Sequence, residues 1–159
     1  MKILVLALLL CAAFACREVT RAIPADIEFV APPVVRYTKA DIQKIHWIKG
    51  AWKSTQPEQA IQQNFQFHPD NTLEITEIGH TGGTLSSLLM WHEGCYYLGD
   101  NREWVVTWIG EKDVRFEPTR PGRDAFTWTR FGEDQWYHVS HQPRGDQPVL
   151  MHRIGGLQP

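Results

Sequence analysis

The feature that most constrains the fold is a series of about ten short segments, rich in aromatic and β-branched residues, that begins near Gly50. Turn-forming residues, mainly Gly, Asp, Asn and Pro, separate these segments at short intervals. The pattern is typical of an antiparallel meander in which consecutive strands pair through hairpins. We expect strands at residues 51–56, 61–67, 72–78, 84–91, 95–98, 104–109, 114–117, 125–131, 136–141 and 149–154.

A meander of this length predicts a closed barrel, because closure removes the exposed strand edges on which other chains could pair. The predicted fold class is therefore all-β. We expect an antiparallel up-and-down β-barrel of about 8–10 strands, preceded by a short N-terminal helix.

The helix signal lies just before the strands. Its apolar positions recur at intervals of three, which places them near one face: Ile42, Ile45 and Ile48. Thr38 or Asp41 is the candidate N-cap, and Gly50 is the residue expected to end the helix.

Residues 1–16 have the order of an export signal. Lys2 is followed by an apolar run at residues 3–10 and by small residues before Cys16. The run is too short to span a membrane, which takes about 20 apolar residues. Residues 13–16 resemble the lipobox of bacterial lipoproteins, which implies that Cys16 is lipidated. The protein would then be periplasmic or on the cell surface, held to the membrane, most simply the outer membrane, by its lipid anchor. Ordinary signal cleavage without lipidation is the alternative.

The chain after this signal divides into a tether and one domain. Residues 17–36 contain three prolines and lack strand or helix periodicity, so we expect an extended tether there. An additional edge strand at residues 27–30 is the alternative. Residues 37–159 would form the barrel domain.

Charge and cysteine content narrow the possible partners. The formal net charge of −2 provides no electrostatic reason to bind nucleic acid, so we expect no nucleic-acid partner. Of the three cysteines, Cys11 falls in the signal and Cys16 would be acylated. Cys95 then has no disulfide partner, and we expect it to be a small buried apolar residue.

Trp47, Gly50 and Trp52, followed by the meander and by Arg153 in the last strand, resemble the start and end of lipocalin-like (calycin) barrels of small bacterial lipoproteins. The resemblance implies that Trp52 plugs one end of the barrel and that Arg153 packs across it. All four residues are structural in this interpretation.

Catalytic and metal-binding patterns are weak in this sequence. His138 and His141 lie three apart on one strand and face opposite sides, so we expect no metal site and no cofactor. Haem held through His138 or His152 is the alternative. His138 and Ser140 share a face, but no nucleophile motif surrounds any serine, and no catalytic residue is predicted. We place the carboxylates of Glu74 and Glu77 on a strand surface.

The tryptophans favour a binding function. If residues 104, 106 and 108 share one face, and 126, 128 and 130 another, the barrel has a continuous aromatic wall. We predict a small hydrophobic or amphipathic ligand. A pocketless envelope interaction module is the alternative, and a hydrolase-like enzyme is the third possibility. The predicted lining residues are Tyr97, Trp108, Trp128, Arg130 and His138.

Overall fold

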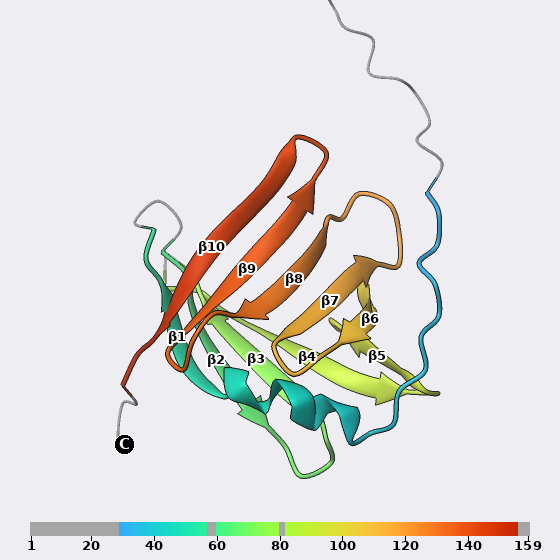
Figure 1. Cartoon of the computed structure of the whole chain (residues 1–159), viewed down its shortest axis with the longest axis horizontal. Coiled ribbons are helices and arrows are strands. Elements are labelled where there is room, and N and C mark those ends of the chain that lie inside the picture. The colour runs from blue at the N-terminus through green and yellow to red at the C-terminus, as the bar shows by residue number, and fades with distance from the viewer. Residues whose placement is uncertain (1–28, 57–59, 80–81, 156–159) are drawn as a thin grey trace, which may run out of the picture.

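The computed structural model describes residues 29–56, 60–79 and 82–155, which form one β-barrel (Figure 1). Each strand pairs antiparallel with its neighbours in chain order, and the first strand closes the barrel against the tenth. The predicted all-β up-and-down barrel with a short N-terminal helix is confirmed. Its elements are η1 (Asp41–Ile48), β1 (Gly50–Ser54), β2 (Gln62–Phe67), β3 (Leu73–Ile78), β4 (Thr84–His92), β5 (Cys95–Leu98), β6 (Trp104–Ile109), β7 (Asp113–Pro118), β8 (Ala125–Arg130), β9 (Gln135–Gln142) and β10 (Gly145–Arg153).

The last strand is longer than the sequence pattern predicts. It begins at Gly145, which pairs with Gln142, and it includes Pro148. The register between β1 and β10 runs only from Trp52–Arg153 to Ser54–Met151. Pro148 lies beyond that register, so the N–H that proline lacks is not needed as a donor to β1.

Helix η1 is a 3₁₀ helix, in which positions three apart lie directly above one another. The spacing of its three isoleucines fits this period, and all three are fully buried in the barrel core. Neither predicted capping residue caps the helix: Ala40 is the N-cap, and the Asp41 carboxylate instead accepts hydrogen bonds from the Thr38 N–H and hydroxyl. Gly50 does follow the helix end as expected: the C-cap is Lys49, and Gly50 is the next residue, with a positive φ, and begins β1.

One end of the barrel is closed by η1, which crosses beneath the strands in Figure 1, and by the Trp52 indole. The Trp52 Nε1–H donates to the Ile48 carbonyl at 2.6 Å. The Arg153 guanidinium lies over the Trp52 ring, with Cζ 4.1 Å from the centroid, and Nη1 donates to the Lys49 carbonyl at 2.8 Å. Gly50 adopts φ +107°, and a Cβ there would lie 3.1 Å from Arg153 Nη1, so glycine suits this position.

The segment before η1 lies against the outside of the barrel. The Tyr37 N–H donates to the Gly94 carbonyl at 2.7 Å, and the Trp91 indole donates to the Tyr37 carbonyl at 3.0 Å. Residues 29–33 lie beside Glu117 and Pro118 at the end of β7. Phe29 and Val30 are not in a strand, whereas Cys16, residues 17–28 and the proposed signal lie outside the described residues. No helix in the described ranges is long and apolar enough to cross a membrane.

Candidate functional site

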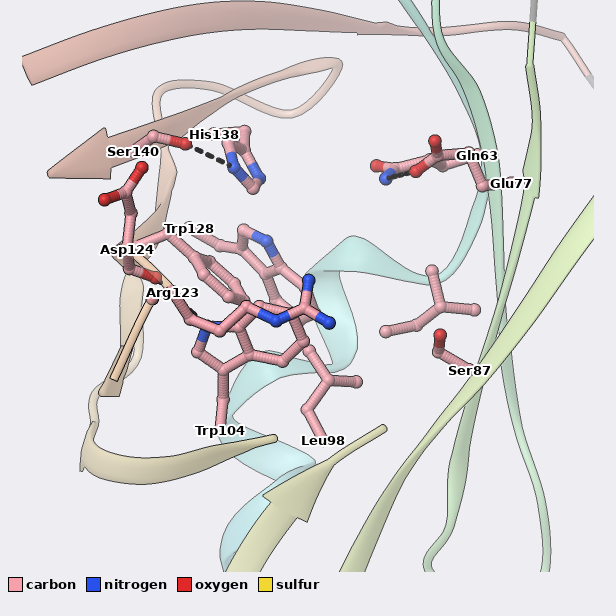
Figure 2. A pocket seen from close by; sticks show the side chains of 13 residues that line it. Gln63, Glu77, Ser87, Leu98, Trp104, Arg123, Asp124, Trp128, His138 and Ser140 are labelled. Atoms are coloured by element: carbon pink, nitrogen blue, oxygen red, sulfur yellow. Dashed lines mark hydrogen bonds between the residues drawn. The ribbon is translucent and has the colours of Figure 1, made fainter. Parts of the chain in front are cut away.

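A pocket of about 440 Å³ occupies part of the barrel lumen, and no residue of η1 lines it (Figure 2). Strands β2–β6, β8 and β9 contribute side chains to it, and the loop between β7 and β8 forms part of its rim. The lining residues are Gln63, Ile75, Glu77, Ser87, Leu98, Trp104, Gly122, Arg123, Asp124, Phe126, Trp128, His138 and Ser140.

One side of the pocket is an aromatic wall. Phe126 and Trp128 alternate on β8, so both face the lumen, with ring centroids 5.9 Å apart. Trp104 of β6 meets Phe126 edge-on at 5.6 Å, and its indole N–H donates to the Asp124 carbonyl at 3.0 Å. This hydrogen bond ties the rim loop to the wall.

The other side carries hydrogen-bonding groups. Gln63 and Glu77 are register partners on β2 and β3, and the Gln63 amide donates to the Glu77 carboxylate at 2.9 Å. Across the lumen, His138 Nε2 and the Ser140 hydroxyl lie 3.3 Å apart on β9. Figure 2 shows the two pairs facing each other over the pocket. Gln63, Glu77 and His138 also border a second cavity of about 200 Å³.

His138 is uncharged at neutral pH. Burial, and to a smaller extent repulsion from His141, lowers its pKa to about 4. Its ring stacks on Phe126, with centroids 5.0 Å apart and planes 16° apart. The imidazole can therefore donate one hydrogen bond and accept another, but it supplies no positive charge to the lumen.

Two arginines at the rim share one carboxylate. The Arg123 guanidinium lies over the Trp104 ring, with Cζ 5.2 Å from the centroid, and bonds the Glu103 carboxylate at 3.3 Å. Arg120 bonds the same carboxylate oxygen at 3.1 Å. The Arg123 guanidinium thus already has two partners, the Glu103 carboxylate and the Trp104 ring.

Two of the five predicted lining residues, Trp128 and His138, lie in the pocket wall. Trp108 does not, because a β-bulge between Val106 and Trp108 reverses the alternation of β6. Its indole is 56% exposed and donates to Asp113 at 3.0 Å. The shared face assigned to residues 104, 106 and 108 is therefore wrong for Trp108.

Tyr97 and Arg130 also lie outside the pocket lining. Leu98 is the β5 residue that faces the pocket, and its neighbour Tyr97 has Arg102 stacked on its ring, 5.4 Å from the centroid. Arg130 ends β8, and its Nε donates to the Gly132 carbonyl at 3.1 Å, beside the turn that follows.

Sequence reasoning missed the carboxylate in the pocket. Glu77 is not on the outer surface as expected, because it shares a face with Leu73 and Ile75, which are buried in the core. The inward direction of Glu77 could have been predicted only from the alternation of side chains along the strand. Glu74 does lie outside, where it bonds His68 and Ser86. Arg123 and Asp124 come from a loop, where no periodicity indicates the direction of a side chain.

Comparison of the chain with protein-family models, with curated proteins and with solved structures gave no match. Within the described ranges, no three His, Cys, Asp or Glu side chains gather closely enough to hold a metal ion.

Proposed function

We propose that the barrel binds a small amphipathic molecule. The observation that carries this proposal is the pocket of about 440 Å³, which has an aromatic wall on one side and hydrogen-bonding groups on the other. Ligand sites in proteins commonly have volumes of about 300–1,000 Å³, mostly apolar walls and a few convergent polar groups. The apolar part of the ligand would lie against Phe126 and Trp128, and its polar part near Glu77 and His138.

The same observation favours a binding protein over a pocketless interaction module. A purely structural barrel is expected to fill its lumen with side chains, as small barrels do. Here the floor is filled by Trp52, Phe65 and Trp136, which are fully buried, while open volume is left above them. Polar side chains border this volume, as expected for a site that orients a ligand.

Our proposal includes export and a lipid anchor at Cys16. The N-terminal segment supports a particular orientation, because residues 29–33 lie beside the end of β7, from which the rim loop starts. Residues 17–28 could reach at most about 40 Å if fully extended. Because the described chain reaches the barrel on the side of the rim loop, we propose that a lipid on Cys16 favours the orientation in which the pocket mouth faces the membrane and a lipophilic ligand can pass between bilayer and barrel.

Native mass spectrometry tests the binding function. The chain beginning at Arg17 is exported to a periplasm behind a cleavable signal and purified without detergent. We expect an additional mass that disappears on denaturation, or that appears after incubation with an envelope lipid extract.

Two serine variants make the test specific to the lumen. Ser87 lines the pocket, whereas its neighbour Ser86 faces outward and bonds Glu74. Ser87→Phe should fill the pocket and abolish the additional mass, and Ser86→Phe adds the same bulk outside and should retain it. An unliganded mass with no uptake from the extract would instead support the pocketless module. Equal uptake by both variants would place the binding site outside the lumen.

A further inference from the structure

We infer that the polar group of the ligand is a cation of the protonated-amine class, bound by the Glu77 carboxylate. This inference rests on the proposed function and specifies its ligand. Glu77 lies on β3 and faces His138 across the lumen (Figure 2).

The Glu77 carboxylate can accept more hydrogen bonds than the donors of the pocket wall provide. An ionised carboxylate has two oxygens and about four acceptor positions. The Gln63 amide, which donates at 2.9 Å, fills one of them and carries no charge. A protonated amine would add N–H donors and the opposite charge, and such charge-assisted hydrogen bonds are stronger than neutral ones.

The charges around the pocket leave Glu77 without a cationic partner in the lining. Arg123 is the one arginine or lysine among the described lining residues, and it bonds Glu103 and covers Trp104. His138 faces Glu77 across the lumen as a neutral imidazole. Carrying an anionic headgroup past the rim would bring it towards a carboxylate that no cation of the lining compensates, and the two negative charges would repel each other.

The aromatic wall adds a second attraction for a cation. Indole and phenyl rings have an electron-rich face that attracts ammonium groups, and tryptophan attracts them best. Trp128 and Phe126 line the same volume as Glu77. Phe116 and His138 stack on the two faces of Phe126. An amine attached to an apolar body would therefore meet the Glu77 carboxylate on one side and the Trp128 indole on the other.

The test compares three probes that share one apolar body and differ in charge: 4-phenylbutylamine, 4-phenylbutanol and 4-phenylbutyrate. Each is titrated calorimetrically at pH 7.5 and low salt into the exported protein as the cell produces it. We expect the amine to bind at least about tenfold more tightly than the carboxylate, with the alcohol between them.

Two β3 variants separate the pocket carboxylate from general charge. Glu77→Gln should weaken amine binding by about tenfold and change alcohol binding by less than about twofold. Glu74→Gln removes one negative charge from the outer face of the same strand, and it should leave both affinities within about twofold. If Glu77→Gln lowers the melting temperature too far for titration, Gln63→Lys is used, because it places a cation beside Glu77 and should abolish the preference for the amine.

The outcomes distinguish this inference from the proposed function. Binding of the alcohol or the carboxylate without preference for the amine overturns the cation assignment and leaves the binding pocket in place. An amine preference that survives both Glu77→Gln and Gln63→Lys also overturns it. If none of the three probes binds but native mass spectrometry finds a ligand, only the cation assignment is overturned. If neither experiment detects binding, the proposed function is wrong as well.

Discussion

His138 combines three properties in one side chain: it lines the pocket, stacks on Phe126 and is neutral at pH 7. Its neutrality follows from burial, because removing water from an imidazolium costs more than removing it from an imidazole. The Ser140 hydroxyl at 3.3 Å gives the ring a hydrogen-bonding partner that serves either tautomer. The neutral ring therefore contributes polarity to the pocket without adding charge.

The depressed pKa of His138 predicts that the fold weakens in mild acid. The pKa is about 4 in the folded protein and 6.5 in the unfolded chain, so the unfolded chain binds the proton first as pH falls. The stability contributed by the neutral ring is complete above pH 6.5 and is lost as the pH falls towards 4, by on the order of 2 kcal/mol. Urea unfolding at pH 7.5 and 4.5 measures this loss.

A matched pair of variants assigns the pH dependence to one ring. His138→Gln should lose less stability between the two pH values than the parent. His92→Gln, which changes a histidine whose side chain is 43% exposed, should follow the parent. Parallel curves for the parent and His138→Gln would contradict the assignment.

At the level of elements, η1, β1 and β10 meet at a single tryptophan. Trp52 is 1% exposed, bonds the last residue of η1 and is covered by Arg153 from β10. Arg153 also bonds Asp134, in the turn before β9, at 3.1 Å. The closure of the barrel between β1 and β10 therefore depends on the stacking of Arg153 on Trp52 as well as on the short run of paired residues between the two strands.

Replacing Trp52 should be among the most damaging single changes in the barrel. We expect Trp52→Ala to lower the free energy of unfolding by about 3–5 kcal/mol, because it leaves a cavity and removes the surface on which Arg153 lies. Trp108→Ala, at an indole that is 56% exposed, should cost about 1 kcal/mol or less. Denaturant unfolding of both variants tests this difference, and equal losses would contradict the role of Trp52 as the plug of the closed end.

For the whole molecule, the arrangement of its two ends bears on the proposed membrane anchor. In Figure 1 η1 lies at one end of the barrel, and the β7–β8 loop that supplies the pocket rim lies at the other. The described chain starts at Phe29, beside the end of β7 rather than beside η1. The segment that leads to the proposed anchor therefore enters the barrel on the side of the pocket mouth.

This orientation is testable with two labelled positions on the acylated protein. A fluorophore at Asp124→Cys, on the rim, should be quenched by a lipid-borne quencher in vesicles more strongly than one at Lys44→Cys, on η1. Buried Cys95 leaves the introduced thiol as the more reactive target in the barrel. Cys16→Ser should remove the quenching at both positions. Equal quenching, or stronger quenching at position 44, would show that the mouth does not face the membrane.

The sequence by itself determined most of the fold, because the relevant signals are local. Turn residues and two-residue alternation located the strands, and the number of hairpin-linked strands favoured closure. The three isoleucines at intervals of three located η1, and the pairing of Trp52 with Arg153 agrees with the resemblance to lipocalin-like barrels. Trp128 and His138 were also recoverable, because β8 and β9 keep their alternation without interruption.

Tertiary structure decided which side chains surround the pocket. Alternation predicts a face only while the register is unbroken, and the bulge in β6 turns Trp108 outward although its spacing from Trp104 places it inward. The direction of Arg123 depends on Glu103 and Trp104, contacts between segments that no local pattern relates. Glu77 is an intermediate case: its alternation was readable, but its charge suggested solvent, and the pocket provides the polar surroundings that allow a carboxylate to face inward.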